Sequence, residues 1–268
     1  MSASLLRTIV AATRRAVSER ETNVPLATLR VEAAPPRAPH AFRGAFEAAS
    51  DLPRIIAECK RRSPSKGILR ETYDPAAIAV AYEQAGAAAV SVLTEPAFFD
   101  GALEHLEAVR AAVHIPVLRK DFIVSRYQIA EARAAGADAV LLIVAALPQA
   151  ELIDLLKTAA DYGMDALVET HDAAEIDRAL AAGAHIVGVN SRNLHTLEVD
   201  TNLVRELAAA IPAGIIGIAE SGIRDASEIS SLGAAGYRGF LVGERFMSAP
   251  DPGAALRAMI AAFEGARP

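Results

Sequence analysis

Cations and carboxylates recur directly after apolar, strand-like runs in this chain. Lys60 follows IIAEC, Lys120 follows PVLR, and Glu169 closes the run ALVE. A lysine ammonium group can protonate an oxygen that gains negative charge, and a carboxylate can remove a proton, when both lie in one desolvated site. We therefore predict acid–base chemistry, provided that the fold brings the ends of these runs together.

Further polar residues follow the same apolar runs. Glu58 lies two residues before Lys60, so both side chains point to the same side of an extended strand. One charge at a strand end is about as often a solvated loop residue as a catalytic one, and only the convergence of many favours a shared site. The remaining candidates are Ser63, Arg119, Asp121, His171, Asn190, Arg192, Glu220 and Ser221.

Two glycines near the C-terminus indicate where a phosphate group would bind. Gly222, in ESGIR, and Gly243, in VGERF, each follow one of the last two apolar runs. Glycine lets backbone N–H groups approach phosphate oxygens closely. In α/β barrels the loops after the seventh and eighth strands are frequent phosphate sites. Taken together, the two glycines favour phosphate binding over a simple turn.

A repeated pattern supplies the elements that would position these groups. In each copy a glycine ends a helical run and an apolar strand begins three residues later, as in AGAAAVSVL and AGADAVLLI. Glycine tolerates the positive φ of a helix C-terminal turn, so each copy predicts a helix end followed by a buried strand. With three further apolar runs, the candidate strands begin near residues 55, 89, 117, 139, 165, 186, 215 and 239.

Amphipathic helix-like stretches separate these strands, for example residues 101–113 and 148–162. Such an alternation predicts a parallel sheet of the α/β class, and eight units predict a (β/α)8 TIM barrel, whose active site lies at the C-terminal ends of the strands. An open doubly wound sheet is the main alternative, but it usually has fewer strands, and no GxGxxG follows the first strand here.

Residues 1–48 do not fit the repeat and are predicted to form an N-terminal helical extension to a catalytic barrel of residues 49–268. Within them, residues 5–17 have the pattern of an amphipathic helix and residues 31–44 that of a Pro-rich connector. The extension would either plug one end of the barrel or cover the substrate. The sequence leaves both possibilities open.

Composition limits the partners. A length of 268 residues suits one barrel, which typically has about 250. The net charge of −6 provides no bulk positive field for nucleic acid or an anionic membrane. A single cysteine, Cys59, and no apolar signal segment lead us to expect a cytoplasmic protein. No cluster of His, Cys and carboxylates has metal-ligand spacing, so we predict no metal site.

Some aromatic and histidine residues are ambiguous. Phe98 and Phe99 follow the second strand and Phe122 follows Lys120, so they form either core or an apolar wall for an aromatic substrate. His171 is a possible base. The segment THD also has the pattern of a helix entry with Asp172 as the N-cap, and we favour that interpretation.

Seven segments, in order from about Leu52 to the end of the chain, match one family pattern. They are AECKRRSPSKG, SVLTEPAFFDG, LRKDFIV, GADAVLLIVAAL, VNSRNL, AESGI and LVGERFM. Together they resemble the indole-3-glycerol-phosphate synthase family. The resemblance implies a TIM-barrel lyase of tryptophan biosynthesis that uses no cofactor. Its substrate would be 1-(2-carboxyphenylamino)-1-deoxyribulose 5-phosphate, which closes into an indole ring with loss of carbon dioxide and water.

Carried over residue by residue, the resemblance implies three main roles. Lys120 is the general acid that protonates the ribulose carbonyl oxygen while the aniline ring carbon attacks the carbonyl carbon. Lys60 meets the substrate carboxylate and holds it until decarboxylation. Glu169 is the general base.

The resemblance also implies a supporting set of residues. Glu58 would orient Lys60 or share protons with it, while Asn190 and Ser221 would hydrogen-bond the substrate. The implied substrate-binding residues are Phe99, Phe122, Leu141, Arg192 and Glu220 around the body of the substrate, and Ser63, Gly222, Gly243 and Glu244 at its phosphate end.

Three positions depart from what is common in the family. Arg62 stands where a small residue is common, Ser191 where many members have Asn, and Arg245 where Ser is frequent. None coincides with an implied catalytic residue. Arg245 would either strengthen phosphate binding or simply be exposed.

Two other functions stay open on the residues. A desolvated barrel lysine is a competent nucleophile, so a Schiff-base aldolase acting on a phosphosugar is the alternative enzyme class. A barrel that binds a phosphorylated metabolite without turnover is the non-enzymatic alternative. In each case we expect a phosphorylated small molecule as the ligand, with no nucleic acid or membrane partner, and a monomer or weak dimer.

Overall fold

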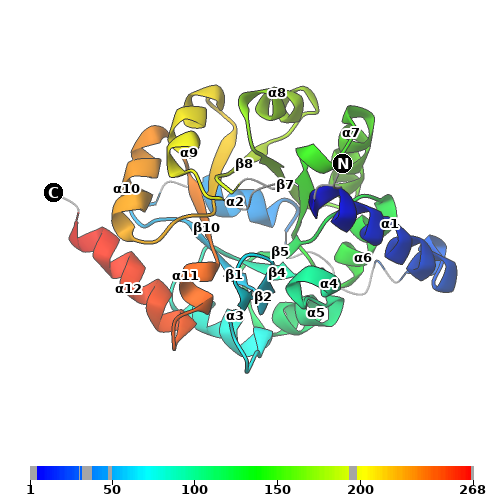
Figure 1. Ribbon diagram of the computed structural model, residues 1–268, viewed down its shortest axis with the longest axis horizontal. Helices are drawn as coiled ribbons and strands as arrows, with labels where there is room; N and C mark the ends of the chain where they lie inside the picture. The colour runs from blue at the N-terminus through cyan, green and yellow to red at the C-terminus, as the bar shows by residue number, and fades with distance from the viewer. Residues whose placement is uncertain (1–4, 30, 32–37, 48–49, 193–197, 267–268) are drawn as a thin grey trace.

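The computed structural model describes residues 5–29, 31, 38–47, 50–192 and 198–266. Within these ranges, eight parallel strands close into a barrel (Figure 1). The predicted TIM barrel is thus confirmed, and each strand begins within a residue of its expected position. The strands are β1 (Ile55–Cys59), β4 (Ala89–Leu93), β5 (Val117–Lys120), β6 (Ala139–Ile143), β7 (Asp165–Thr170), β8 (Ile186–Asn190), β9 (Ile216–Glu220) and β10 (Gly239–Val242).

One helix follows each barrel strand and packs on the outside. Acidic caps begin most of these helices, as where Asp172 accepts a hydrogen bond from Glu175 N at 2.8 Å. At their other ends the repeat glycines have positive φ, for example 87° at Gly136 and 88° at Gly183. The outer helices are α3 (Pro75–Gln84), α5 (Leu103–Ala112), α6 (Arg126–Ala134), α7 (Gln149–Asp161), α8 (Ala173–Ala181), α9 (Thr201–Leu207), α10 (Ala226–Ala235) and α12 (Pro252–Gly265).

Short elements that the repeat does not predict lie in the connections. Besides η2 (Val144–Ala146), which follows β6, three of them come directly after barrel strands and so lie at the C-terminal end of the barrel, where they shape its mouth. These are the hairpin of β2 (Arg62–Ser63) and β3 (Gly67–Ile68), α4 (Pro96–Phe99) and α11 (Glu244–Met247). The 3₁₀ turns are η1 (Leu26–Thr28), η2 (Val144–Ala146) and η3 (Ala208–Ala210).

Strand parity divides the interior into layers. Inward-facing side chains such as Ile56, Leu118 and Ile218 form a buried apolar cluster inside the barrel, while the alternate residues pack against the helices. Two positions further along each strand, the same inward face reaches the C-terminal mouth. The apolar layer therefore forms the floor beneath the polar residues at the strand ends.

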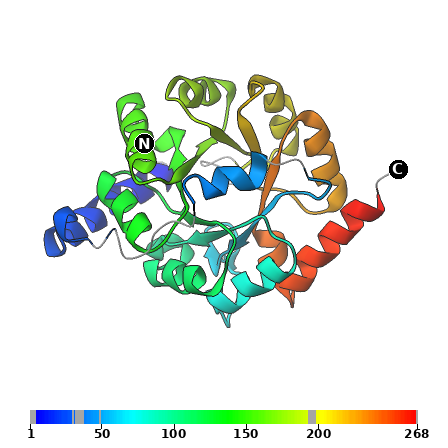
Figure 2. The same ribbon diagram turned by 180° about the vertical axis from the view of Figure 1, so that it is seen from behind.

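The helix α2 (Ala41–Glu47) closes the N-terminal end of the barrel (Figure 2). Phe42 and Phe46 are fully buried in the inner apolar cluster, and their rings lie 5.2 Å apart. Asp165, the first residue of β7, accepts a hydrogen bond from Arg43 N at 2.8 Å and lies 2.8 Å from His40 Nδ1. This part of the extension is the plug.

The helix α1 (Leu5–Asn23) lies at the side of the barrel against α6 (Figure 1). Arg20 holds both carboxylate oxygens of Glu131 on α6, at 2.7 and 3.0 Å. Its first turn, with Leu5, Leu6 and Ile9, lines the cavity at the barrel mouth. Of the two possibilities that the sequence left open, the structure shows the plug, and it places the start of α1 at the cavity. The connector predicted for residues 31–44 is wrong at its C-terminal end, because residues 41–44 form the start of α2. Residues 32–37 of that connector and the division between residues 48 and 49 lie outside the described residues.

No helix in the described part of the chain is both long and apolar enough to cross a membrane.

Candidate active site

A cavity of about 1030 Å³ opens at the C-terminal ends of the strands. It is lined by residues from most strands and the loops that follow them, and by the start of α1. All the catalytic and substrate-binding residues that the family resemblance implied take part in its lining: Glu58, Lys60, Ser63, Phe99, Lys120, Phe122, Leu141, Glu169, Asn190, Arg192, Glu220, Ser221, Gly222, Gly243 and Glu244.

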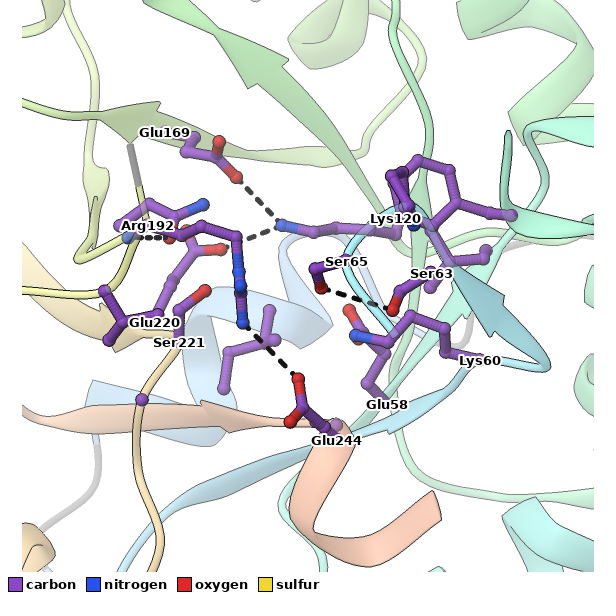
Figure 3. A pocket seen from close by; sticks show the side chains of 18 of the residues that line it. Glu58, Lys60, Ser63, Ser65, Lys120, Glu169, Arg192, Glu220, Ser221 and Glu244 are labelled. Carbon is purple, nitrogen blue, oxygen red and sulfur yellow. Dashed lines mark hydrogen bonds and ion pairs between the residues drawn. The ribbon is translucent and has the colours of Figure 1, made fainter. Parts of the chain in front are cut away.

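Lys120 lies between two carboxylates at the centre of this cavity (Figure 3). Its Nζ donates to Glu169 Oε2 at 2.9 Å and to Glu220 Oε2 at 2.8 Å. The two carboxylates are at most 3% exposed, so the ion pairs are shielded from water. These three residues come from β5, β7 and β9, and Lys120 and Glu220 are 100 positions apart in the sequence. They meet here because the barrel closes.

Burial and charge together set the protonation states of this cluster. Burial lowers the pKa of Lys120, but the carboxylates of Glu169, Glu220 and Glu58 overcome that effect and raise it well above its ordinary value. Burial opposes ionisation of Glu169, yet Lys120 and His171 bring its pKa well below the usual range.

The pKa of Glu220 moves in the opposite direction. Burial raises it, the neighbouring charge of Glu169 adds to the rise, and Lys120 only partly compensates. At neutral pH, Lys120 is therefore charged and Glu169 is ionised. Glu220 is the member of the cluster that first takes up a proton.

A second lysine–carboxylate pair lies across the cavity. Lys60 Nζ donates to Glu58 Oε1, and both side chains point into the mouth, as their strand parity predicts. Gly243 leaves room for this pair, because a Cβ there would run into the Glu58 carboxylate. Gly188 on β8 does the same for Glu220 Oε1. The glycines at these strand positions thus make space for buried carboxylates.

An apolar wall lies beside the charged groups. The Phe99 and Phe122 rings, 6.2 Å apart between centroids, line the cavity with Leu93, Leu141 and Ile143. Both phenylalanines are only partly buried. The question that the sequence left open is answered for these two rings, which form a wall of the cavity.

The opposite side of the cavity offers small residues and backbone groups. Ser221 and Gly222 both have positive φ, 65° and 74°. A non-glycine residue in this region costs about 1 to 3 kcal/mol, and such strain is common at functional sites. Ser63 at the end of β2 and Gly243 before α11 also line the cavity. The positions suit close approach of an anion to the backbone.

Glu244 is paired with cations on this side. Its carboxylate lies 3.4 Å from an Arg192 guanidinium nitrogen and 3.8 Å from Lys66 Nζ. Asn190 Oδ1 accepts a hydrogen bond from Arg192 N at 3.0 Å, which fixes the start of this segment. The arrangement makes Glu244 a residue that positions two cations.

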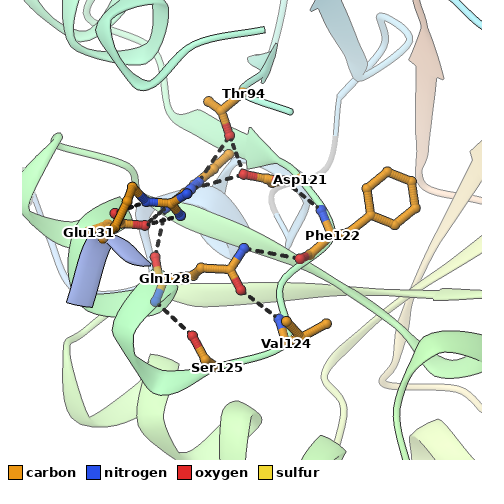
Figure 4. A network of polar contacts seen from close by, with 9 residues as sticks. Thr94, Asp121, Phe122, Val124, Ser125, Gln128 and Glu131 are labelled. Atoms are coloured by element: carbon orange, nitrogen blue, oxygen red, sulfur yellow. Dashed lines mark hydrogen bonds and ion pairs between the residues drawn. The ribbon is translucent and has the colours of Figure 1, made fainter. Parts of the chain in front are cut away.

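Arg119, also a candidate from its place at a strand end, points away from the cavity. It is 2% exposed and donates to Asp121 Oδ2, Thr94 Oγ1 and the Gln128 carbonyl oxygen at 2.8 to 3.0 Å. Glu131 adds a contact from α6, and Asp121 Oδ1 accepts from Phe122 N at 2.8 Å (Figure 4). The cluster fixes the backbone that carries Lys120 and Phe122.

The interpretation of the segment around His171 as a helix entry is confirmed, and the structure adds a contact of its ring. Asp172 is the N-cap of α8, as predicted. The His171 ring nevertheless also faces the site, because its Nε2 lies 3.3 Å from Glu169 Oε1. The capping pattern does not reveal this second contact, since it specifies the backbone and leaves the ring free to turn.

Several lining residues were missed from the sequence, among them Leu5, Leu6, Ile9, Lys66 and Arg224. The apolar face of the N-terminal helix and the lysine in SPSKG are the signals that would have found the first four. Arg224 carries no comparable signal, because it follows a weak motif.

A family model described as indole-3-glycerol phosphate synthase matches residues 6–259. The chain belongs to this family. A relative named indole-3-glycerol phosphate synthase, from Parafrankia sp. (strain EAN1pec), is 54% identical over 240 residues, which cover 88% of this chain and 87% of the relative. Another of the same name, from Mycolicibacterium gilvum (strain PYR-GCK), is 49% identical over 97% of this chain and 95% of its own length.

Solved structures with other names share the fold of this synthase family. Thiamine phosphate pyrophosphorylase from Pyrococcus furiosus superposes with a TM-score of 0.60 at 18% identity, covering 80% of this chain and 96% of that one. A mandelate oxidase structure also gives 0.60, at 16% identity, over 82% of this chain and 74% of its own. At such identities the likeness shows the barrel alone.

The three departures from the family's common residues have distinct surroundings. Arg62 lies 3.5 Å from Asp100, which also binds Arg61, so it helps to hold the β2–β3 hairpin against the end of α4. Ser191 is buried. Arg245 is exposed at the rim of the cavity and donates to the Arg224 carbonyl oxygen at 3.2 Å.

Proposed function

We propose that this member of the indole-3-glycerol phosphate synthase family closes the indole ring of 1-(2-carboxyphenylamino)-1-deoxyribulose 5-phosphate, with Lys120, Lys60 and Glu169 in the main roles. The observation that carries the proposal is the ammonium group of Lys120 between two buried carboxylates, opposite a second lysine and beside an aromatic wall.

The cavity offers complementary surroundings for each part of this substrate. The carboxyphenyl ring fits against Phe99 and Phe122, with its carboxylate toward Lys60. The phosphate lies at the other end, where Gly222 and Gly243 expose their backbones. Ring stacking and the two anionic groups then fix the orientation of the substrate, and the reacting carbon atoms meet near Lys120.

Ring closure needs an acid at the carbonyl oxygen. As the aniline ring carbon attacks the carbonyl carbon, negative charge develops on that oxygen, and Lys120 Nζ donates a proton to it. Three carboxylates ensure that Lys120 carries this proton when the substrate binds. An ammonium group held in a water-poor cavity stabilises such charge far better than water does.

Decarboxylation follows from the same intermediate. Loss of carbon dioxide returns an electron pair to the ring and restores its aromaticity. Lys60 holds the carboxylate beside the ring until the carbon–carbon bond breaks. Glu58 neutralises and positions Lys60 through their ion pair.

Dehydration completes the reaction and needs an acid and a base on one intermediate. Glu169 is ionised and so is ready to take a proton from the methylene carbon that lies between the ring nitrogen and the hydroxyl-bearing carbon. An ammonium group protonates the departing hydroxyl, which leaves as water, and the double bond of the indole forms. Both lysines lie in the cavity and can supply that proton.

We further propose that the protein acts in the cytoplasm. The support is its single cysteine, Cys59, which is buried and whose thiol pKa burial raises well above its ordinary value, so that it is unreactive.

Incubation of the chain with the carboxyphenylamino ribulose phosphate tests the proposed reaction. We expect the absorbance and fluorescence of an indole product, which stand out because the chain contains no tryptophan. Borohydride is added in a parallel reaction to trap any Schiff base. A covalent adduct of Lys60 or Lys120 with a ketose phosphate, together with absence of an indole signal, would favour the aldolase alternative.

A further inference from the structure

His171 lies just beyond the end of β7, beside the proposed base. Its Nε2 is 3.3 Å from Glu169 Oε1, and its Nδ1 is 3.1 Å from Glu175 Oε2. The ring is largely buried but does not line the substrate cavity. It therefore bridges Glu169 and the first turn of α8 without a place to touch the substrate.

The ring orientation is fixed from the α8 side. Glu175 Oε2 accepts a hydrogen bond from His171 N at 2.8 Å and also meets the ring Nδ1. The side chain of Asp172 in turn accepts from Glu175 N. This is a capping-box arrangement, and it holds Glu175 rigidly where it can anchor the imidazole.

The charges around the ring favour its protonated form. Burial lowers the pKa of His171, but the neighbouring carboxylates of Glu169 on β7 and Glu175 on α8 overcome this and raise it to about 10. Beyond Glu169, the next charged groups are Lys120 on β5 and then Glu220 on β9. At neutral pH the ring is an imidazolium between two carboxylates, with a donor on each nitrogen.

The two oxygens of Glu169 therefore have different partners. Oε2 accepts from Lys120 Nζ at 2.9 Å and faces the cavity. Oε1 faces His171, whose Nε2 makes no well-aligned hydrogen bond, so the contact acts as an ion pair. A carboxylate that is 2% exposed has no water to replace a lost partner. Without His171, the Oε1 atom would lose the cation that lies 3.3 Å from it.

We propose that His171 is a positioning residue of this reaction, which holds Glu169 Oε1 so that Oε2 stays directed at Lys120 and at the proton to be removed. The inference rests on the proposed function, since it assigns His171 a role through Glu169. Loss of the imidazolium has two effects. It frees the carboxylate to rotate, and it makes the ionised form of Glu169 harder to maintain at low pH.

Two substitutions separate positioning from mere packing. His171→Leu fills the space without a donor, whereas His171→Gln places an amide donor near the position of Nε2. For His171→Leu we expect kcat to fall by at least about tenfold with little change in KM, as for loss of an interaction to a charged group. In the pH–rate profile of His171→Leu, we also expect the acid limb to move to higher pH by about one unit or more. His171→Gln should restore most of kcat.

The matched control is His114→Leu, at a histidine whose side chain is 84% exposed and lies outside the cavity. Its kcat and pH profile should equal those of the unsubstituted chain. A kcat of His171→Leu within twofold of the control, or an acid limb that does not move in either His171 variant, would overturn the inference. If His171→Leu does not fold, His171→Gln still decides, because an unchanged pH profile would contradict a role for the imidazolium charge.

Glu169→Gln, measured in parallel, keeps the two claims distinct. If Glu169→Gln loses activity while the His171 variants do not, the positioning role fails and the base assignment stands. If Glu169→Gln is fully active, the base assignment itself fails, and the positioning role fails with it.

Discussion

Removal of the Lys120 ammonium group has effects that the structure allows us to work out. In Lys120→Met the side chain keeps much of its length but loses the ammonium group that pairs with both Glu169 and Glu220. The lost nitrogen stood 2.9 and 2.8 Å from their oxygens. Loss of a general acid lowers rates by about 10² to 10⁴-fold. We therefore expect kcat to fall by at least about 100-fold.

The same substitution changes proton binding in the folded state. Two carboxylates that are at most 3% exposed now face each other without a cation, so one of them takes up a proton. Its folded pKa then lies above its unfolded value, and the folded state binds more protons than the unfolded state. In the unsubstituted chain the pKa of Glu220 is already raised to about 7, so the unfolding free energy of the variant falls relative to that of the unsubstituted chain as pH rises above about 7.

Indole formation followed by absorbance gives kcat, and urea unfolding at pH 5 and pH 8 gives the two stabilities. A circular dichroism spectrum of Lys120→Met that matches the unsubstituted chain ensures that the fold is intact. Turnover within tenfold of the unsubstituted chain would refute the role of Lys120 as general acid. A stability difference that does not grow between pH 5 and pH 8 would contradict the account of the buried carboxylates.

Three further predictions concern packing and charge around the site. Gly243→Ala places a Cβ against the Glu58 carboxylate and should lower kcat/KM by about tenfold or more. Gly44→Ala is the control, because nothing lies within 4 Å of its added Cβ, and its kcat/KM should not change. Equal values of kcat/KM for the two variants in steady-state kinetics would contradict the crowding of Glu58. Because the pKa of His171 is raised from 6.5 to about 10, its contribution to stability is present in full below pH 6.5 and is lost as pH rises through 10. His171→Gln should therefore remove a slope of up to about 1.4 kcal/mol per pH unit from urea-derived stabilities between pH 7 and 10, and an unchanged slope would count against this. Phe46→Ala leaves a cavity in the buried plug and should lower the unfolding free energy by about 3 to 5 kcal/mol, measured by denaturation. The folded fraction of this variant should keep its kcat. A loss below about 1 kcal/mol would mean that α2 does not close the barrel as described.

The strand ends could be predicted from the sequence because the signals are local. A glycine such as Gly136 or Gly183 stops one helix, and the apolar run that begins three residues later fixes where the strand begins and ends. Once the sheet closes, all C-terminal ends meet at one mouth. The convergence of Lys120, Glu169 and Glu220 then follows from the topology, without knowledge of any contact.

The direction of neighbouring side chains needed the structure. Arg119 and Lys120 follow the same apolar run and carry the same charge, yet Arg119 points to the helix layer and Lys120 to the cavity. Parity relative to the inward-facing Leu118 would separate them, but only after the inner cluster is known.

The partners of the N-terminal extension could not be predicted. Amphipathicity shows that a helix has an apolar face, but does not show which surface covers it. Phe42 and Phe46 meet the inner barrel, while Leu5, Leu6 and Ile9 line the cavity. The contact of His171 with Glu169 was missed for a similar reason, since it depends on a ring angle that a distant carboxylate fixes.

The most direct test of the central claim measures two products at once. Under single-turnover conditions, with the chain in excess over the carboxyphenylamino ribulose phosphate, carbon dioxide release and indole absorbance are followed in the same sample. We predict one molecule of carbon dioxide for each molecule of indole formed. In Lys120→Met, we predict that both products form far more slowly than in the unsubstituted chain. Carbon dioxide without indole, indole without carbon dioxide, or no reaction at all in the unsubstituted chain would contradict the central claim.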